Sequence, residues 1–272
     1  MSTKWVHVGA VDKLTQLVSE IKDAGSPVIF VSPHLDDAVL SCGALLTQLA
    51  RTNSVTVLTV FSSARPPAKW APSARTELRN HGAVDAMKYF EDRRAEDIAA
   101  MKEVGAAWIH LGFTDAPFRR VGETAGKDSG RAAYPSFHLN IARGWIASSD
   151  ATLAAKVSVM VREAVSASAA TAVFAPLGAG RHVDHLITRN AVAASGIDAV
   201  YYSDFPYSQT AKPSARFVRK ASLRPYTWLA GRAENVNLIG KYKTQVDGLF
   251  PRGIPISPET YWIREPDPAG AG

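Results

Sequence analysis

Histidine and aspartate residues gather in two short segments of this 272-residue chain. The first is PHLDD at residues 33–37, and the second is HVDH at residues 182–185. Imidazole nitrogen and carboxylate oxygen are good ligands for zinc and other first-row metals. Two adjacent carboxylates that lose water repel each other, and a bound cation relieves that cost. The segments together can therefore supply two histidines and one carboxylate to a metal, with acid–base groups left over.

Within these segments, the roles of metal ligand and acid–base group can be assigned to the residues in several ways. A catalytic zinc keeps three protein ligands and one position for water. Either Asp36 or Asp37 could bind the metal, while the other takes a proton from the water. A simpler interpretation is that Asp37 only caps a helix that begins near residue 38, but this leaves His34 and Asp36 unexplained. In the second segment one histidine could bind the metal and the other donate a proton, with Asp184 fixing the ring tautomer. The alternative there is a polar loop with solvated histidines.

Short apolar runs alternate along the chain with helical patterns. The sequence predicts strands over residues 27–32, 54–61, 106–112, 171–176, 198–204 and 259–265. Spacing of apolar residues predicts helices over residues 11–24, 38–51, 75–104 (in two pieces), 152–168, 186–195 and 237–250. This alternation predicts an α/β fold with a mostly parallel sheet.

Both His/Asp segments come directly after a predicted strand. In open α/β sheets, ligands bind outside the carboxyl ends of the strands, so we expect the two segments to converge there. Two long stretches, residues 113–150 and 205–235, show no regular pattern. Such stretches are either lids and binding loops or plain surface connections.

Composition limits the class of protein. The net charge of +6 includes no run of five like charges, which argues against a nucleic-acid partner. Cys42 is the single cysteine, so no internal disulfide can form, and a buried helical position is expected for it. The N-terminal segment has no apolar signal-peptide core, and no apolar stretch is long enough to span a membrane. These features predict a soluble cytoplasmic protein with one domain over residues 1–272.

The two segments resemble the motifs of the PIG-L/LmbE-like deacetylase family, which read roughly PHPDD and HPDH. Ser41-Cys42-Gly43, RRAED at 93–97 and LGFTD at 111–115 are similar to further family segments, and the resemblance spans about residues 27–200. It implies a Rossmann-like three-layer fold and metal-dependent removal of an N-acyl group, most often N-acetyl from a glucosamine-type sugar. Zinc is the implied cofactor, with Fe²⁺ as an alternative. A small N-acetylated amino sugar is the implied partner.

The family motifs also imply roles for single residues. Carried over by motif position, the metal ligands would be His34, Asp37 and His185. Asp36 would be the general base. His182 would be the general acid or would stabilise the oxyanion, with Asp184 supporting it. This assignment, unlike the spacing alone, distinguishes Asp36 from Asp37.

The chain departs from the family pattern at several positions. Leu35 and Val183 replace the usual prolines, and neither position contributes a functional group. A glycine-bearing loop is not evident at residues 61–63, and Arg181 stands where some members have a tyrosine. These differences bear on the substrate more than on the reaction.

Two residues outside the motifs are candidates for binding substrate. They are Arg93 and Asp115, each in a segment similar to the family. For Arg93, the competing interpretation is an ion pair with Glu96 or Asp97 on one helix face. For Asp115, it is capping of a loop.

Other residues carry weaker signals. His110 lies in an apolar strand, where a core histidine with a satisfied hydrogen bond is expected. His81 and His138 are expected at the surface. Tyr226 and Trp228 could stack on a sugar ring or anchor the core.

Three other functions are compatible with parts of the pattern. Adjacent aspartates suit a magnesium phosphoesterase, although two histidines argue against magnesium. Two histidines and a carboxylate also occur in iron(II) oxygenases. A binding module that holds a nucleotide without catalysis is the third, but the first turn has no GxGxxG motif and places carboxylates where a phosphate would lie.

Overall fold

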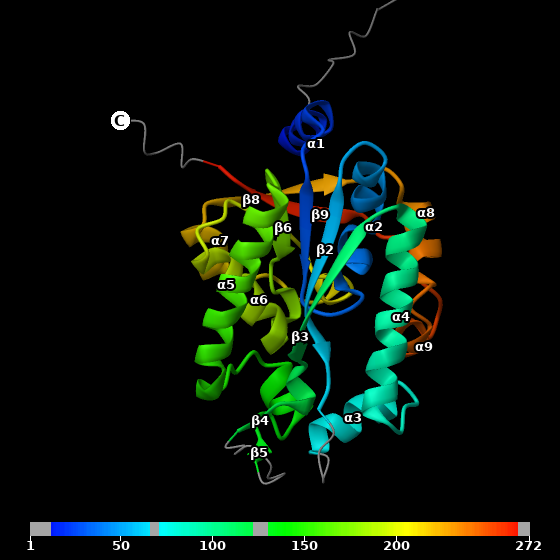
Figure 1. The fold of residues 1–272 in the computed structure, drawn as a ribbon, viewed down its shortest axis with the longest axis vertical. Coiled ribbons are helices and arrows are strands. Elements are labelled where there is room, and N and C mark those ends of the chain that lie inside the picture. The colour runs from blue at the N-terminus through cyan, green and yellow to red at the C-terminus, as the bar shows by residue number, and fades with distance from the viewer. Residues whose placement is uncertain (1–11, 66–70, 122–129, 266–272) are drawn as a thin grey trace, which may run out of the picture.

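A seven-stranded sheet forms the centre of the molecule in the computed structural model, which describes residues 12–65, 71–121 and 130–265 (Figure 1). The strand order is β3-β2-β1-β6-β7-β9-β8. The strands are β1 (Val28–Ser32), β2 (Val55–Ser63), β3 (Ala107–Thr114), β6 (Ala172–Pro176), β7 (Val200–Tyr202), β8 (Leu223–Trp228) and β9 (Glu259–Arg264).

Strand directions divide the sheet into two parts. The pairs β1–β2, β2–β3, β1–β6 and β6–β7 are parallel. Strand β9 runs antiparallel to both β7 and β8. The predicted α/β fold with a mostly parallel sheet is confirmed, and the sheet is mixed because of this C-terminal part.

Alternating side chains on the central strands build two cores, one on each face of the sheet. Val28 and Phe30 of β1 pack on one face, and Ile29 and Val31 pack on the other. This pattern arises because successive side chains of a strand point to opposite faces. The first core joins helices α1 (Lys13–Ala24), α2 (Asp37–Ala50), α4 (Ala86–Val104), α8 (Arg232–Ile239) and α9 (Lys243–Leu249). The second core joins α5 (Ala151–Ser168), α6 (Val183–Ala194) and α7 (Ala215–Lys220). Figure 1 shows the resulting three layers.

Most predicted helix limits agree with the structure. Helix α1 begins after Asp12, whose side chain accepts a hydrogen bond from Thr15 N at 2.9 Å, and ends at Gly25 in a left-handed conformation. Val11, which the prediction included, lies outside the described residues. The region predicted as two helical pieces contains α3 (Pro72–Asn80) and α4. No helix among the described residues is long and apolar enough to cross a membrane.

Two predictions about the C-terminal third are wrong. Residues 205–235 are not irregular, because they contain α7, the edge strand β8, the start of α8 and the short helix η5 (Tyr207–Gln209). Strand β8 was not predicted because it contains Pro225. An edge strand tolerates proline because one of its sides forms no ladder hydrogen bonds. The single helix predicted over 237–250 is two helices, since α8 ends before Gly240 and α9 begins at Lys243.

The stretch 113–150 contains only short elements in its described part. Beyond the end of β3 these are η1 (Ala116–Phe118), β4 (Arg120–Val121), β5 (Arg131–Ala132), η2 (Phe137–Ile141) and η3 (Ser148–Asp150). Residues 122–129 of this stretch lie outside the described residues. This segment follows the carboxyl end of β3, at the same edge of the sheet as the ends of β1 and β6.

Candidate active site

The first segment forms a tight turn between β1 and α2. Ser32 fixes this turn, because its hydroxyl donates to His34 O at 2.6 Å and accepts from Ala38 N at 3.0 Å. Asp37 is the first residue of α2, and its Oδ2 accepts a hydrogen bond from the backbone N–H of His34 at 2.9 Å. The cap position belongs to Asp36, whose side chain makes no capping hydrogen bond. The interpretation of Asp37 as a simple helix cap is therefore wrong.

The second segment leads from β6 into α6. The short helix η4 (Ala179–Arg181) turns the chain, and Gly180 has a φ of 79°. A β-carbon at Gly180 would lie 2.5 Å from the Cβ of Tyr207, so only glycine allows this close approach. His182 caps α6, and its Nδ1 accepts a hydrogen bond from Asp184 N at 3.3 Å. An accepting Nδ1 places the ring hydrogen of a neutral His182 on Nε2.

The two segments converge, as their positions after predicted strands indicated, because β1 and β6 are neighbours in the sheet. Oδ2 of Asp37 lies 3.0 Å from His34 Nδ1 and 3.2 Å from His185 Nε2. His34, His182 and His185 can also place one ring nitrogen each within 4.8 Å of one another. All four side chains are buried. Residues from both segments thus form one His/Asp cluster that could hold a metal.

His185 supplies the clearest indication that the cluster is a cation site. Its Nδ1 lies 2.7 Å from Oδ1 of Asp204, and a carboxylate can only accept, so Nδ1 carries the hydrogen. Nε2 is buried and has no hydrogen-bond partner in the described chain, yet it faces Asp37 Oδ2. Burial lowers the pKa of His185, but the charges of Asp37 and Asp204 outweigh it and raise that pKa to about 9. The contact of Nε2 with Asp37 Oδ2 needs a positive charge, which either a proton on Nε2 or a metal ion supplies, and these buried histidine and carboxylate donors therefore fit a divalent metal.

His34 stands between carboxylates on both sides of its ring. Its Nε2 lies 3.2 Å from Asp184 Oδ2 and 3.5 Å from Asp115 Oδ1. Burial alone would lower the pKa of His34, but the charge of Asp115 and the hydrogen bonds to its carboxylate neighbours hold it well above the usual value. His34, Asp115 and Asp184 form a second set of potential ligands. Asp184 is held from behind, because it accepts hydrogen bonds from Arg119 and from Ala116 N.

Asp36 and Arg93 form a buried pair at the edge of the cluster. Arg93 Nη2 lies 3.3 Å from Asp36 Oδ1, and Arg93 Nη1 lies 3.8 Å from Asp115 Oδ2. Burial raises the pKa of Asp36 to about 6, against the opposing charge of Arg93. The alternative pairing of Arg93 along its own helix is wrong, since Glu96 accepts hydrogen bonds from Thr244 instead. Arg93 and Asp115 both line the site.

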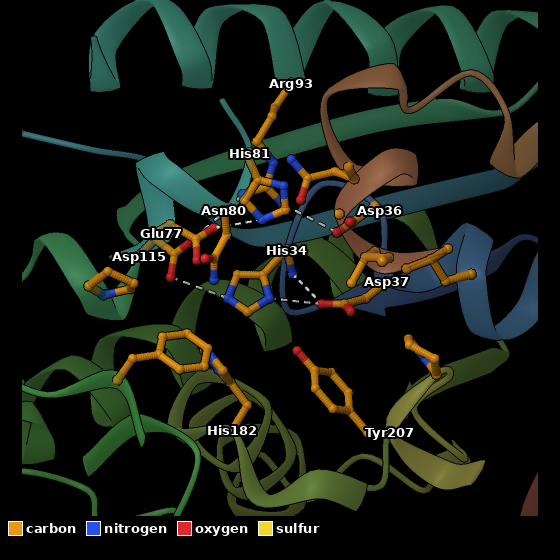
Figure 2. Close-up of a pocket in the computed structure, with 17 residues that line it drawn as sticks. His34, Asp36, Asp37, Glu77, Asn80, His81, Arg93, Asp115, His182 and Tyr207 are labelled. Atoms are coloured by element: carbon orange, nitrogen blue, oxygen red, sulfur yellow. Dashed lines mark hydrogen bonds and ion pairs between the residues drawn. The ribbon is translucent and has the colours of Figure 1, made fainter. Parts of the chain in front are cut away.

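A cavity of about 320 Å³ opens beside the cluster (Figure 2). Several of its lining residues belong to no motif in the sequence and were not predicted; they are Glu77 and Asn80 of α3, Tyr207 of η5 and Gln245 of α9. His81, predicted at the surface, also lines the cavity, and its side chain is only 10% exposed. Helix α3 follows the end of β2 at the same sheet edge as the two motifs, and this position was the available signal.

Comparison with known proteins agrees with this geometry. Residues 29–195, more than half of the chain, match the family described as PIG-L: GlcNAc-PI de-N-acetylase. The chain belongs to the PIG-L family. The predicted family and the predicted deacetylase activity are therefore confirmed, and the protein is an amide hydrolase with a buried His/Asp site for a metal.

Relatives of this PIG-L protein include enzymes with named substrates. It is 31% identical to a 2'-N-acetylparomamine deacetylase from Streptomyces fradiae over 233 residues, which cover 83% of this chain and 72% of that enzyme. It is similar to a deacetylase–bog complex from the biosynthesis pathway of teicoplanin, with a TM-score of 0.73 and 26% identity, covering 89% of this chain and 100% of the other. It is also similar to the zinc-inhibited form of teicoplanin deacetylase, with a TM-score of 0.69 and 25% identity over 89% of this chain and 100% of the other.

The two departures at the proline positions of the family motifs are apolar packing positions. Leu35 is buried in a small cluster with residues of α3 and α4. Val183 is buried in another cluster, beside Ala116 and Tyr134. Neither side chain adds a polar group to the site.

The remaining candidates lie away from the PIG-L site. His110 is half-buried rather than fully in the core, and its Nε2 lies 2.7 Å from Asp97 Oδ2. His138 is exposed and Cys42 is buried, as predicted. Trp228 packs in the core of the far sheet edge, so it anchors the fold and does not stack on substrate.

Proposed function

We propose that this chain is a zinc-dependent N-deacetylase that acts on an N-acetylated amino sugar within a small molecule of the aminoglycoside or glycopeptide type. One observation carries the metal part of this proposal. The buried Nε2 of His185 faces Asp37 Oδ2 at 3.2 Å and lacks a hydrogen-bond partner in the described chain. The printed names of the relatives support the substrate class.

The proposed metal ligands are His34, Asp37 and His185. Three nitrogen or oxygen ligands leave one position open, as in catalytic zinc sites. When bound, zinc would act as a Lewis acid on the acetamide carbonyl and make a coordinated water more acidic. Asp204 positions His185 through Nδ1, and such a second partner typically strengthens a histidine ligand.

Asp36 is the proposed general base. Its pKa of about 6 leaves it mostly ionised at neutral pH, yet closer to neutrality than an ordinary aspartate, and this suits proton transfer. Asp36 takes a proton from the attacking water while the water oxygen bonds to the acetyl carbon. Arg93, 3.3 Å from Asp36, keeps the carboxylate in place and limits the rise of its pKa.

His182 is the proposed partner of the developing oxyanion. Its Nδ1 is occupied by Asp184 N, so Nε2–H is free to donate toward the cavity that His182 lines. Burial holds the pKa of His182 well below the usual value, which favours the neutral ring in this role. As the carbon–nitrogen bond breaks, the departing nitrogen receives the proton that Asp36 took from the water, while His182 Nε2–H stays hydrogen-bonded to the oxyanion, and acetate and a free amine leave. Asp184 supports this arrangement through its backbone N–H, while its carboxylate holds His34.

The test is acetate release from 2'-N-acetylparomamine by protein loaded with one equivalent of zinc. One equivalent is used because a related enzyme is known in a zinc-inhibited form. We expect release that chelation abolishes and that one equivalent of zinc restores, and Fe²⁺ is compared in parallel. Phosphate release from p-nitrophenyl phosphate without acetate release would instead identify the phosphoesterase considered above. If neither product forms with any N-acetylated amino sugar, the proposed function is wrong.

A further inference from the structure

The cavity is negative, although the chain as a whole carries a net charge of +6. The lining residues include one guanidinium, that of Arg93, and four carboxylates, which are those of Asp36, Asp37, Glu77 and Asp115. With neutral histidines, a divalent metal would still leave one negative charge in excess. The cavity therefore lacks one positive charge that neither the described lining nor the proposed metal supplies.

Glu77 is the carboxylate without a cationic partner. Asp36 and Asp115 each lie within 4 Å of the Arg93 guanidinium. Glu77 instead accepts a hydrogen bond from the Tyr89 hydroxyl at 3.2 Å, and its Oε1 lies 3.5 Å from His81 Nε2. Both contacts involve Oε1, and Oε2 has no hydrogen bond or ion pair with the residues that the structure describes. One carboxylate oxygen thus remains available in the cavity wall.

His81 adds a second acceptor beside Glu77. Its Nδ1 lies 3.0 Å from the carbonyl oxygen of Thr244, which can only accept, so Nδ1 carries the ring hydrogen. In the neutral ring Nε2 is then an acceptor, and it has no hydrogen to offer Glu77. The Glu77 carboxylate and the His81 ring lie side by side on the α3 side of the cavity (Figure 2), so a carboxylate oxygen neighbours the lone pair of the neutral imidazole. A group with several N–H donors and a positive charge satisfies both.

This pair of acceptors is held in place by the packing of α3, α4 and α9. Gln245 Nε2 donates to the Tyr89 hydroxyl at 2.9 Å, and that hydroxyl donates to Glu77. A β-carbon at Gly248 would lie 3.2 Å from the His81 ring, so the helix backbone approaches the ring closely. The Glu77 side chain is only 13% exposed. A fixed and partly desolvated carboxylate binds a cation more strongly than a mobile surface one.

We propose that Glu77, with His81 beside it, binds an ammonium group of the substrate, and that the substrate is therefore an N-acetylated sugar compound that carries a second, free amine. This inference rests on the proposed deacetylase function and assigns a specificity residue to the same site. Glu77 does not take part in the reaction itself. It selects and orients the substrate through a charged hydrogen bond.

The test compares two substrates of wild-type enzyme. One is 2'-N-acetylparomamine with its other amines free, and the matched compound has hydroxyl groups in place of those amines. We expect kcat/KM to be at least about tenfold higher for the compound with free amines, which corresponds to about 1.4 kcal/mol. Because the partly exposed pair is screened by salt, the preference should shrink at high ionic strength.

Glu77→Gln separates charge from shape. It keeps the size of the side chain and an oxygen for the Tyr89 hydroxyl, but it removes the negative charge. We expect KM for the amine-bearing substrate to rise about tenfold, with kcat and the metal content unchanged, and KM for the hydroxyl analogue to change less than twofold. Glu91→Gln, the same change at an exposed position of α4, is the control and should alter neither substrate.

A binding measurement keeps the inference testable without turnover. Calorimetry with paromamine, the deacetylated product, should show binding to wild type and about tenfold weaker binding to Glu77→Gln. If Glu77→Gln raised KM equally for both substrates, or bound the product as tightly as wild type, the inference would be overturned while the deacetylase function stayed intact. Absence of acetate release from both substrates, together with Glu77-dependent product binding, would overturn the proposed function alone.

Discussion

The metal wall (His34 and Asp37, which line the cavity, with His185 buried next to them) and the substrate wall (Glu77, His81 and Gln245) are built in different ways. The metal wall comes from the turns after β1 and β6, where a parallel sheet brings strand ends together. The substrate wall comes from α3 and α9, which are far apart in the sequence. They meet through the His81–Thr244 hydrogen bond and through Tyr89 of α4, which links Gln245 to Glu77. The sheet topology thus places the proposed metal ligands, whereas packing between helices places the residues proposed to select the substrate. Changes in the two walls should therefore have separable effects.

The largest separable effect is expected at Asp36, beside the metal wall. Asp36→Asn should lower kcat by about 10²–10⁴-fold, because the amide cannot take a proton from water. Metal content should remain that of wild type, since Asp36 is not a proposed ligand. Kinetics of acetate release and elemental analysis of the same sample provide the measurement. Asp92→Asn, at a half-exposed position of α4, is the control. Near-normal turnover in Asp36→Asn would contradict the assignment of the base.

Asp204 tests whether the metal wall depends on a residue behind it. Asp204 holds Nδ1 of His185 at 2.7 Å and accepts from Ala179 N at 2.7 Å. Asp204→Asn should weaken metal affinity by about 10–100-fold, the usual cost of losing such a partner. Competition with a chelator measures the affinity. Asp198→Asn, at an exposed position just before β7, should leave the metal affinity unchanged. Unchanged affinity in Asp204→Asn would mean that His185 needs no support.

Tyr89 tests the substrate wall without a change of charge. Tyr89→Phe removes the hydroxyl that links Gln245 to Glu77 and costs about 1 kcal/mol of stability through one buried hydrogen bond. We expect KM for an amine-bearing substrate to rise severalfold, with metal content and kcat unchanged. Tyr226→Phe, at the far edge of the sheet, should not affect KM. A fall in metal content in Tyr89→Phe would show that the two walls are not separable.

The smallest effect on the site is expected from Glu259, which contacts α2 at Ala44 and Leu45, outside the cavity lining. This buried carboxyl on β9 accepts hydrogen bonds from Ala44 N at 2.6 Å and Leu45 N at 3.2 Å, and burial raises its pKa from 4.5 to about 7. The folded state therefore holds this proton more tightly than the unfolded state. The contribution of Glu259 to stability is complete below about pH 4.5 and is lost as the pH rises to about 7.

Denaturant midpoints at pH 5 and pH 8 measure this contribution. Glu259→Gln should reduce the decrease in stability between these pH values, while metal content and KM stay as in wild type. An unchanged pH dependence in the variant would show that another group is responsible.

The difference between the walls also explains what could be predicted from sequence. PHLDD and HVDH each lie within a few residues after an apolar strand, so local sequence and the rules for parallel sheets were enough to predict their convergence. His81 has no comparable signal, because its role depends on α9, more than 160 residues later in the chain. The role of Asp204, which follows β7, also depends on a contact that the local sequence does not reveal, its hydrogen bond with His185.

Edge effects account for the remaining errors in the predicted fold. Strand β8 contains Pro225 and pairs only with β9 among the described strands, so its pattern of apolar residues is weak. The break between α8 and α9 at Gly240 depends on the packing of each helix against a different neighbour, α2 for α8 and α4 for α9. Contacts between elements that are distant in the sequence are not visible in the local pattern of residues.

Metal content of the purified protein, wild type beside His185→Ala, tests the central claim most directly. His138→Ala, which removes an exposed histidine, is the matched control. We predict close to one equivalent of zinc or iron in wild type and in His138→Ala, and loss of most of that metal in His185→Ala. A metal content that His185→Ala does not change, or a wild type that binds no zinc when it is offered, would contradict the convergence of the two segments on one metal site.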